Sequence, residues 1–293
     1  MAIILAARHT ELLGITTVNG NASLGRTTAN ALVMTQLLDI DTPVHSGAAH
    51  PLNTPPVDAA NIHGESGLDG AVLPPVTRAA ASDDAVGFVI DSARTHDGLW
   101  IVAVGPLTNV ALALRTWPRL ASKIAGISIM GGSSTHGNTT AAAEFNMWAD
   151  PEAADIVLSC GAPLKMSGLN LTYTVQATPS RIAAIRAIGS PLATIVADLL
   201  TFFSHTYMAR NHSIEGAPVH DACAVLALTH PELFTSAMVH AVVELRGAHT
   251  RGMTLVDSRP LRAPTAAPNV ELMTSVDADA LFALLTDAVA SFS

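Results

Sequence analysis

Several polar segments of the sequence hold side chains that could bind or transform a small molecule. They fall just after apolar runs that predict β-strands, and open parallel sheets bind their ligands at the carboxyl ends of the strands. The segments are residues 19–21, 105–109, 131–138, 143–146 and 218–221. Each also has a structural explanation, such as a turn at 19–21 or a helix N-cap at Asp221. Their combination indicates one polar site built from several segments.

The residue types in these segments suit a sugar diol and a hard cation. A glutamate and several asparagines offer directional acceptors and donors to neighbouring hydroxyl groups. A carboxylate and a free backbone carbonyl are oxygen ligands suited to Ca²⁺ or Mg²⁺. His220 stands next to Asp221 in the chain, and a histidine in that place could act as a general acid at neutral pH.

The elements that position these segments follow a regular alternation of β-rich apolar runs and Ala/Leu-rich helical stretches, which is the pattern of βαβ units. Strands are predicted over residues 14–19, 43–45, 98–104, 126–130, 164–166, 234–245, 252–256 and 270–274. Helices are predicted over 26–38, 107–115, 151–159, 179–188 and 191–210, from His220, and from Asp277. No repeat, linker or low-complexity tract divides the chain. We therefore expect a single domain over 1–293, of α/β class, with a Rossmann-like open, mostly parallel sheet flanked by helices.

Composition narrows the class of partner. Hydrophobic residues make up 49% of the chain and charged residues 13%, which is enough for a large core. The net charge of −9, without a Lys/Arg cluster, argues against a nucleic-acid surface. The opening apolar run, residues 1–7, is too short for a signal-peptide core or a membrane span. Cys160 and Cys223 cannot form a disulfide framework. We expect a cytoplasmic protein with no membrane or nucleic-acid partner.

Two further enzyme classes lack their motifs. A nucleotide-cofactor enzyme should carry G-x-G-x-x-G after its first strand or a Walker G-x-x-x-x-G-K-[ST], and neither occurs. A zinc enzyme should carry clustered ligands, but the 12 histidines form no H-x-x-x-H pair and no Cys/His group.

The polar segments, in this order, resemble the inosine–uridine type of nucleoside hydrolase. The resemblance covers essentially the whole chain: LLGITTVNGNASLGRTTANAL, IHGESGLDG, VGPLTNVALAL, SIMGGSSTHGNTTAAAEFNMWADPEAADIVL and APVHDACAVLALTHPELF. The last two stretches together are the most specific. The resemblance implies hydrolysis of the N-glycosidic bond of ribonucleosides to ribose and a free base, in nucleoside salvage. Relatives are often homo-oligomers, so a dimer or tetramer is expected.

The resemblance also implies a role for particular positions of this sequence. Contacts to the ribose fall on Asn21, Asn138, Glu144 and Asn146. The backbone carbonyl of Thr108 and the carboxylate of Asp221 would bind Ca²⁺, and His220 would lie near the leaving base as a proton donor. His63, in the loop 63–70 (HGESGLDG), would touch the nucleobase or be a plain loop histidine. Tyr207, Arg210 and His212, on or just after the predicted helix 191–210, could also line the base pocket, but a surface or core role is favoured for each.

One departure from the family pattern concerns the start of the chain. The family begins with a strand ending in a D-x-D-P-G-x-D-D cluster, followed at once by an apolar helix that residues 1–6 match. The cluster, which should supply three metal-binding aspartates including the base that activates water, is absent from this sequence. We therefore expect a sheet without its first strand, a weakly held Ca²⁺ and impaired catalysis.

Two explanations of this departure compete. A start codon placed too late is favoured, because the remaining site residues keep the family's chemical types. The alternative is a true truncation, which would leave an inactive homologue or a ribose- or nucleoside-binding protein without turnover.

Overall fold

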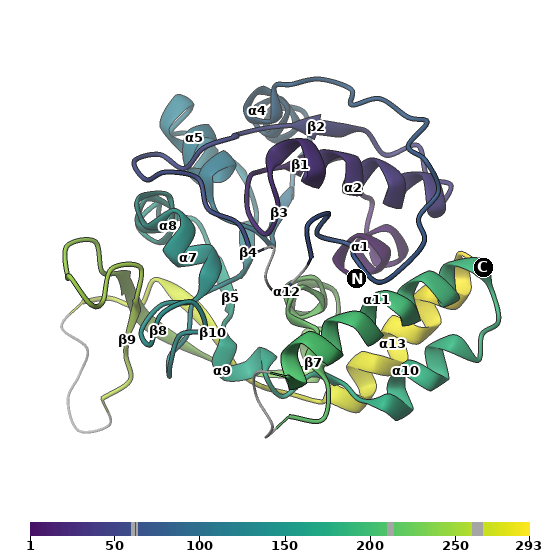
Figure 1. Cartoon of the computed structure of the whole chain (residues 1–293). Coiled ribbons are helices and arrows are strands. Elements are labelled where there is room, and N and C mark those ends of the chain that lie inside the picture. Colours follow the sequence, from purple (N-terminus) through teal and green to yellow (C-terminus); the bar gives the residue numbers. More distant parts are fainter. Residues whose placement is uncertain (60–61, 63, 210–213, 260–265) are drawn as a thin grey trace.

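The computed structural model describes residues 1–59, 62, 64–209, 214–259 and 266–293 (Figure 1). The helices within them are α1 (Ala2–His9), α2 (Leu24–Leu37), α4 (Ala85–Thr95), α5 (Thr108–Thr116), α6 (Leu120–Lys123), α7 (Phe145–Ala149), α8 (Pro151–Leu158), α9 (Leu169–Thr172), α10 (Pro179–Arg186), α11 (Pro191–Met208), α12 (His220–Thr229) and α13 (Ala278–Ser291), with a 3₁₀ turn at Pro231–Leu233. The strands are β1 (Ile15–Thr17), β2 (Val44–Ser46), β3 (Trp100–Ala103), β4 (Gly126–Met130), β5 (Leu164–Ser167), β6 (Gln176–Ala177), β7 (Ala217–Pro218), β8 (Phe234–Val243), β9 (Thr254–Asp257) and β10 (Val270–Val276).

The main sheet has six strands in the order β3-β4-β5-β10-β8-β9. Strands β3, β4, β5 and β10 run parallel, whereas β8 and β9 join as antiparallel neighbours. Strands β1 and β2 form a separate parallel pair. The expected α/β class with a mostly parallel sheet is confirmed, but the described strands divide into separate sheets instead of one.

The carboxyl ends of β1 and β3 nevertheless lie side by side. The Asn109 Nδ2 group, just after β3, donates to the carbonyl of Thr17 at the end of β1 over 2.8 Å. A Cβ atom on Gly105 would lie 3.3 Å from Val18 Cγ1. The polar segments that follow these two strands therefore share one rim of the fold.

Helices cover both faces of the main sheet and enclose two hydrophobic cores (Figure 1). On one face α12 lies against β4 and β5, and α1, α11 and α13 lie beyond it. On the other face lie α4, α5 and α8. Every residue of β4 is buried, as expected for a parallel strand covered on both faces. Helix α12 is buried on nearly all sides, which explains its unbroken run of small and apolar residues.

Short capping signals in the sequence set where several helices begin. Asp150, Thr178 and Ser190 each accept a backbone N–H hydrogen bond in the first turn of α8, α10 and α11. A proline follows each of them at the first helical position, where its missing N–H costs nothing. By contrast, α1 begins after Met1 without a side-chain cap.

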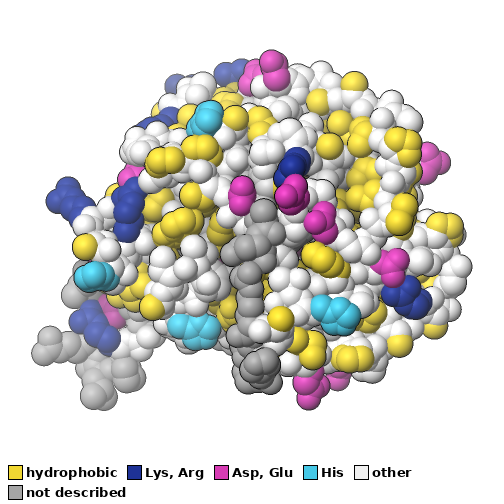
Figure 2. All heavy atoms as spheres, viewed as in Figure 1, with side chains coloured by type: hydrophobic (Ala, Val, Ile, Leu, Met, Phe, Trp, Pro, Cys, Tyr) yellow, Lys and Arg dark blue, Asp and Glu magenta, His cyan; other side chains and the backbone are white. Residues whose placement is uncertain are grey.

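Within the described residues no helix combines the length and the apolar character needed to cross a bilayer. On the face shown in Figure 2, the Lys and Arg side chains lie as separate spots and form no continuous basic surface.

Two half-buried histidines are held in places that favour their neutral form. His45 in β2 stacks on Phe88 at 4.0 Å, and its Nδ1 atom lies 2.8 Å from Ser82 Oγ, while its buried Nε2 atom has no partner in the described structure. Burial lowers the pKa of His45, opposed by Asp84. Burial likewise lowers the pKa of His9, and the neighbouring His230 and Arg8 add to this shift.

These two histidines should make the protein less stable in mild acid. A histidine whose pKa is lower in the folded than in the unfolded state contributes fully above the unfolded pKa of about 6.5, and the contribution is lost as the pH falls below it. Glu144 and Asp221, whose pKa values burial raises to about 7 and about 6, act in the opposite sense, so the histidine contribution is measured by comparing variants. The quantity compared is the free energy of unfolding at pH 7.5 minus that at pH 5.5, from urea unfolding followed by circular dichroism. The difference should shrink in His45→Gln but not in His50→Gln, since His50 is exposed. An unchanged difference in His45→Gln would contradict the assignment.

Candidate active site

The N-terminus of α12 carries the residue that the sequence singled out as a cation ligand. Strand β7, which pairs with β6, leads directly into α12. Asp221 lies in the first turn of the helix, where the helix dipole favours a carboxylate. Burial raises the pKa of Asp221 to about 6, and the α-amino group of Met1 opposes that shift. Burial also lowers the pKa of the Met1 α-amino group, opposed by Asp221. The Asp221 carboxylate is thus buried at the start of α12 and costly to ionise there.

His220, the preceding residue, is held from both sides of its ring. Its Nδ1 atom lies 2.7 Å from Thr172 Oγ1, and its Nε2 atom lies 3.2 Å from the Tyr207 hydroxyl. Tyr173 meets the ring edge-on, with ring centroids 5.7 Å apart. The chain has only two tyrosines, and both contact His220. The imidazole is therefore fixed in one orientation by α9 and α11.

Glu144 lies in a cradle of backbone N–H groups. Its Oε2 atom accepts hydrogen bonds from Gly132 N at 2.9 Å, Asn146 N at 3.0 Å and Met147 N at 3.2 Å. The residue is 3% exposed. Burial raises the pKa of Glu144 to about 7; the three N–H hydrogen bonds oppose the shift and Asp221 adds to it. The carboxylate is thus costly to ionise alone and would be stabilised by positive charge placed beside it.

Tyr173 connects the Glu144 cradle to His220. Burial raises the pKa of Tyr173, and the nearby carboxylate of Glu144 adds to that shift. The same ring lies 5.6 Å from that of His136 in the loop after β4. Sequence reasoning did not single out Thr172 or Tyr173. Their position just past the carboxyl end of β5 is the signal that could have identified them.

Asn146 and Asn138 hold the loop that carries Glu144. Asn146 Nδ2 donates to the carbonyl of Met130 at 2.9 Å and reaches that of Val104 at 3.4 Å, so it joins the ends of β3 and β4. Asn138 is exposed, and its Oδ1 atom accepts from Phe145 N at 2.9 Å. Both side chains therefore border the Glu144 cradle.

Thr108 begins α5, and its side chain is fixed by Asp150. Its hydroxyl donates to Asp150 Oδ2 at 2.7 Å, and the same oxygen accepts from Leu52 N at 3.0 Å. Asp150 is fully buried and its other oxygen caps α8 at Ala153 N. Asp150 thus connects α5, α8 and the loop after β2, which fixes the backbone at Thr108.

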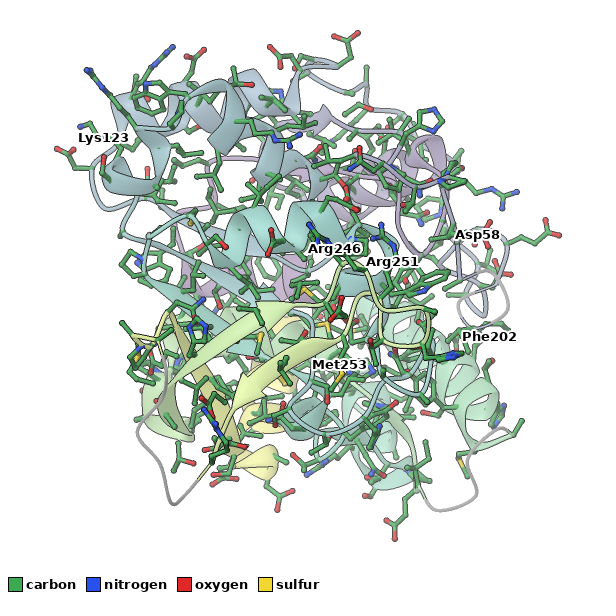
Figure 3. All side chains as sticks on the ribbon, turned by 90° about the vertical axis from the view of Figure 1, so that its left-hand side faces the viewer. Asp58, Lys123, Phe202, Arg246, Arg251 and Met253 are labelled. Carbon is green, nitrogen blue, oxygen red and sulfur yellow. The ribbon has the colours of Figure 1, made fainter. Side chains whose placement is uncertain are left out.

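Asn21 is hydrogen-bonded to the segment that leads to the loop 63–70. Asn21 is exposed, and its carbonyl accepts from Ala59 N at 3.1 Å. His63, Arg210 and His212 lie outside the described residues. The described part of the loop is anchored to α2, where Asn30 Nδ2 donates to Ser66 O at 2.8 Å. It also meets α11, because a Cβ atom on Gly70, which has φ +106°, would lie 2.2 Å from Phe202 Cβ (Figure 3).

The described residues do not by themselves fit a divalent cation. Among them no three Asp, Glu, His or Cys side chains come together as a ligand group. Asp221 and the Thr108 carbonyl are oxygen donors of the right type, but they fall short of the 6–8 oxygens that Ca²⁺ takes.

Comparison with known proteins shows which enzymes this chain resembles. The chain is 42% identical over 295 residues to the pyrimidine-specific ribonucleoside hydrolase RihA of Enterobacter sp. (strain 638), covering 100% of this chain and 94% of that protein. It is 44% identical over 291 residues to RihA of Escherichia coli O1:K1 / APEC, covering 98% and 93%.

The solved structures agree with the sequences. A purine-preferring ribonucleoside hydrolase from Gardnerella vaginalis superimposes with a TM-score of 0.92 at 31% identity, covering 99% of this chain and 94% of that one. The inosine-guanosine nucleoside hydrolase IG-NH gives a TM-score of 0.86 at 27% identity, with 98% and 94% covered. The model of the inosine-uridine preferring nucleoside hydrolases matches residues 1–283, and this chain belongs to that family.

Proposed function

We propose that this protein hydrolyses the N-glycosidic bond of ribonucleosides, with pyrimidine ribonucleosides preferred, and that the sugar is held around Glu144. The observation that carries the proposal is the buried Glu144 carboxylate in its N–H cradle, with the Tyr173 ring near both Glu144 and His220. Glu144 suits the sugar of a nucleoside, and His220 suits its base. Family membership supplies the reaction class.

Glu144 is suited to stabilise the positive charge that the reaction creates on the sugar. Breaking an N-glycosidic bond places positive charge on the ribose ring in an oxocarbenium-like state. A carboxylate in a water-poor site stabilises that charge more than it would in bulk solvent. Glu144 meets this requirement, and Asn21, Asn138 and Asn146 are proposed to hold the sugar hydroxyls with it.

His220 is suited to neutralise the negative charge that develops on the leaving base. His220 is proposed to donate a proton to the departing base, since its ring is oriented by Thr172 and Tyr207. His63 is proposed to contact the same base. The pyrimidine preference rests on the 42–44% identity to proteins named pyrimidine-specific, against 31% to one named purine-preferring.

Asp221 and the Thr108 carbonyl are proposed to contribute to a Ca²⁺ site. The family generally uses a metal ion, and such an ion would supply positive charge to anchor hydroxyl groups and water. The remaining oxygens would come from the substrate diol and water. Homo-oligomer formation stays a prediction; Met238, Val242 and Leu255 give the outer face of β8 and β9 an exposed apolar character. The single domain over 1–293 likewise stays a prediction.

The first test concerns Glu144. With uridine, cytidine and inosine as substrates, we expect base and ribose in equal amounts, with the highest kcat/KM for the pyrimidines. Glu144→Gln should lower kcat/KM for uridine by about 10²-fold, because the carboxamide cannot stabilise positive charge. Glu271→Gln, which alters an ion pair with Lys165 on the main sheet, is the control. Ribose-dependent melting without base release in the unaltered protein would instead favour a binding protein.

The second test concerns His220. His220→Ala should lower kcat strongly for uridine, whose uracil leaves poorly without a proton, by about 10²-fold or more. It should hardly change kcat for p-nitrophenyl β-D-ribofuranoside, whose leaving group needs no proton. Equal losses on both substrates would exclude the role of proton donor.

The third test concerns the cation. We expect CaCl₂ to raise the melting temperature and a chelator to reverse the rise, with weak binding on the order of 10⁻³ M because few protein ligands are present. The rise should vanish in Asp221→Asn and persist in Asp198→Asn, since Asp198 lies on the surface beside Arg186. A calcium effect of the same size in both variants would rule out Asp221 as a ligand.

A further inference from the structure

The loop between β8 and β9, residues 244–253, reaches back over the helices that carry Glu144. The loop is closed by its own hydrogen bonds: Glu244 Oε1 accepts from Arg246 N at 2.6 Å and Gly247 N at 2.9 Å, and Gly252 N donates to Glu244 O at 2.7 Å. Figure 3 shows this hairpin facing the viewer, with Arg246, Arg251 and Met253 labelled. It is therefore a compact unit with a defined shape.

Gly252 brings the hairpin into backbone contact with α7. Gly252 has φ +82°, and a Cβ atom there would lie only 2.8 Å from Trp148 Cα. Trp148 belongs to α7. Two backbone N–H groups in the first turn of this helix, those of Asn146 and Met147, donate to the Glu144 carboxylate. Only glycine permits this approach, and any displacement of α7 moves two of the three donors of the cradle.

Thr254, at the start of β9, lies against Gly132, whose N–H is the third donor to Glu144. Thr254 is 3% exposed, and a Cβ atom on Gly132 would lie 2.6 Å from its Oγ1 atom. Gly132 N is the donor that reaches Glu144 from the turn after β4. Residues 252–254 thus contact both backbone segments that hold the Glu144 carboxylate.

Arg251 anchors the hairpin to the adjoining helix. Its Nη2 atom lies 2.7 and 2.8 Å from the two carboxylate oxygens of Glu152, and its Nη1 atom donates to Leu245 O at 2.6 Å. Glu152 stands in the first turn of α8, directly after the Asp150 cap. The ion pair therefore joins the hairpin to the start of the helix that follows α7.

We propose that the hairpin segment 251–254 positions Glu144 for the sugar, with Gly252 setting the place of α7 and Arg251 holding the hairpin against α8. The assignment of Glu144 to the sugar rests on the proposed function; the positioning itself does not. Because the charge-stabilising group must be placed to within a fraction of an ångström, small shifts of α7 should cost activity out of proportion to stability.

The test compares two glycines with the same backbone strain. Gly252 and Gly161 both have φ +82°, but a Cβ atom on Gly161 would have nothing within 4 Å. Gly252→Ala and Gly161→Ala should therefore lose comparable stability from strain, while only Gly252→Ala pushes on Trp148. We expect amide hydrogen exchange at Asn146 and Met147 to become at least about 10-fold faster in Gly252→Ala alone, together with a fall in kcat/KM for uridine of about 10- to 100-fold.

A gentler variant keeps the proposal testable if Gly252→Ala does not fold. Arg251→Lys preserves the charge but loses the planar guanidinium, and Arg186→Lys, in the surface pair with Asp198, is its control. The same two readouts should change in Arg251→Lys and not in Arg186→Lys. Unchanged exchange at Asn146 and Met147 in the hairpin variants would overturn the positioning role. Altered exchange in a protein that hydrolyses no nucleoside would overturn only the proposed function.

Discussion

The buried Glu144 carboxylate is the group on which the organisation of this site depends. An ionised carboxylate in a protein interior needs compensating donors, and here three backbone N–H groups from two segments provide them. The effect of burial on the pKa is larger than that of the three hydrogen bonds, since the pKa of Glu144 is raised to about 7. The cradle therefore leaves part of the carboxylate's demand for positive charge unmet, which is the property a site for an oxocarbenium-like sugar requires.

The rim around Glu144 is built from buried polar side chains that each connect separate stretches of backbone. Asn146 joins the ends of β3 and β4, Asn109 joins α5 to β1, and Asp150 joins α5, α8 and the loop after β2. A buried polar group is stable only when its hydrogen bonds are satisfied, so these connections allow little displacement. The two separate sheets consequently present a common rim.

The sequence by itself determined the fold class, most elements and the family. Gly126–Met130 is apolar throughout and is a fully buried strand; Asp150 and Ser190, each followed by proline, begin α8 and α11 as predicted. These features are local, since hydrophobic periodicity and helix caps act over a few residues and can be recognised without tertiary contacts. The motifs around Glu144 and His220 identified the family for the same reason.

Only the tertiary structure decided how these motifs act on one another. That Tyr173 lies near both Glu144 and His220, that Asp150 holds Thr108, and that Gly252 lies against Trp148 all depend on contacts between residues distant in the sequence. No periodicity or cap signal encodes such pairs, because they arise from the packing of whole helices and loops. The raised pKa of Glu144 belongs to the same class, since burial is created by the folded chain as a whole.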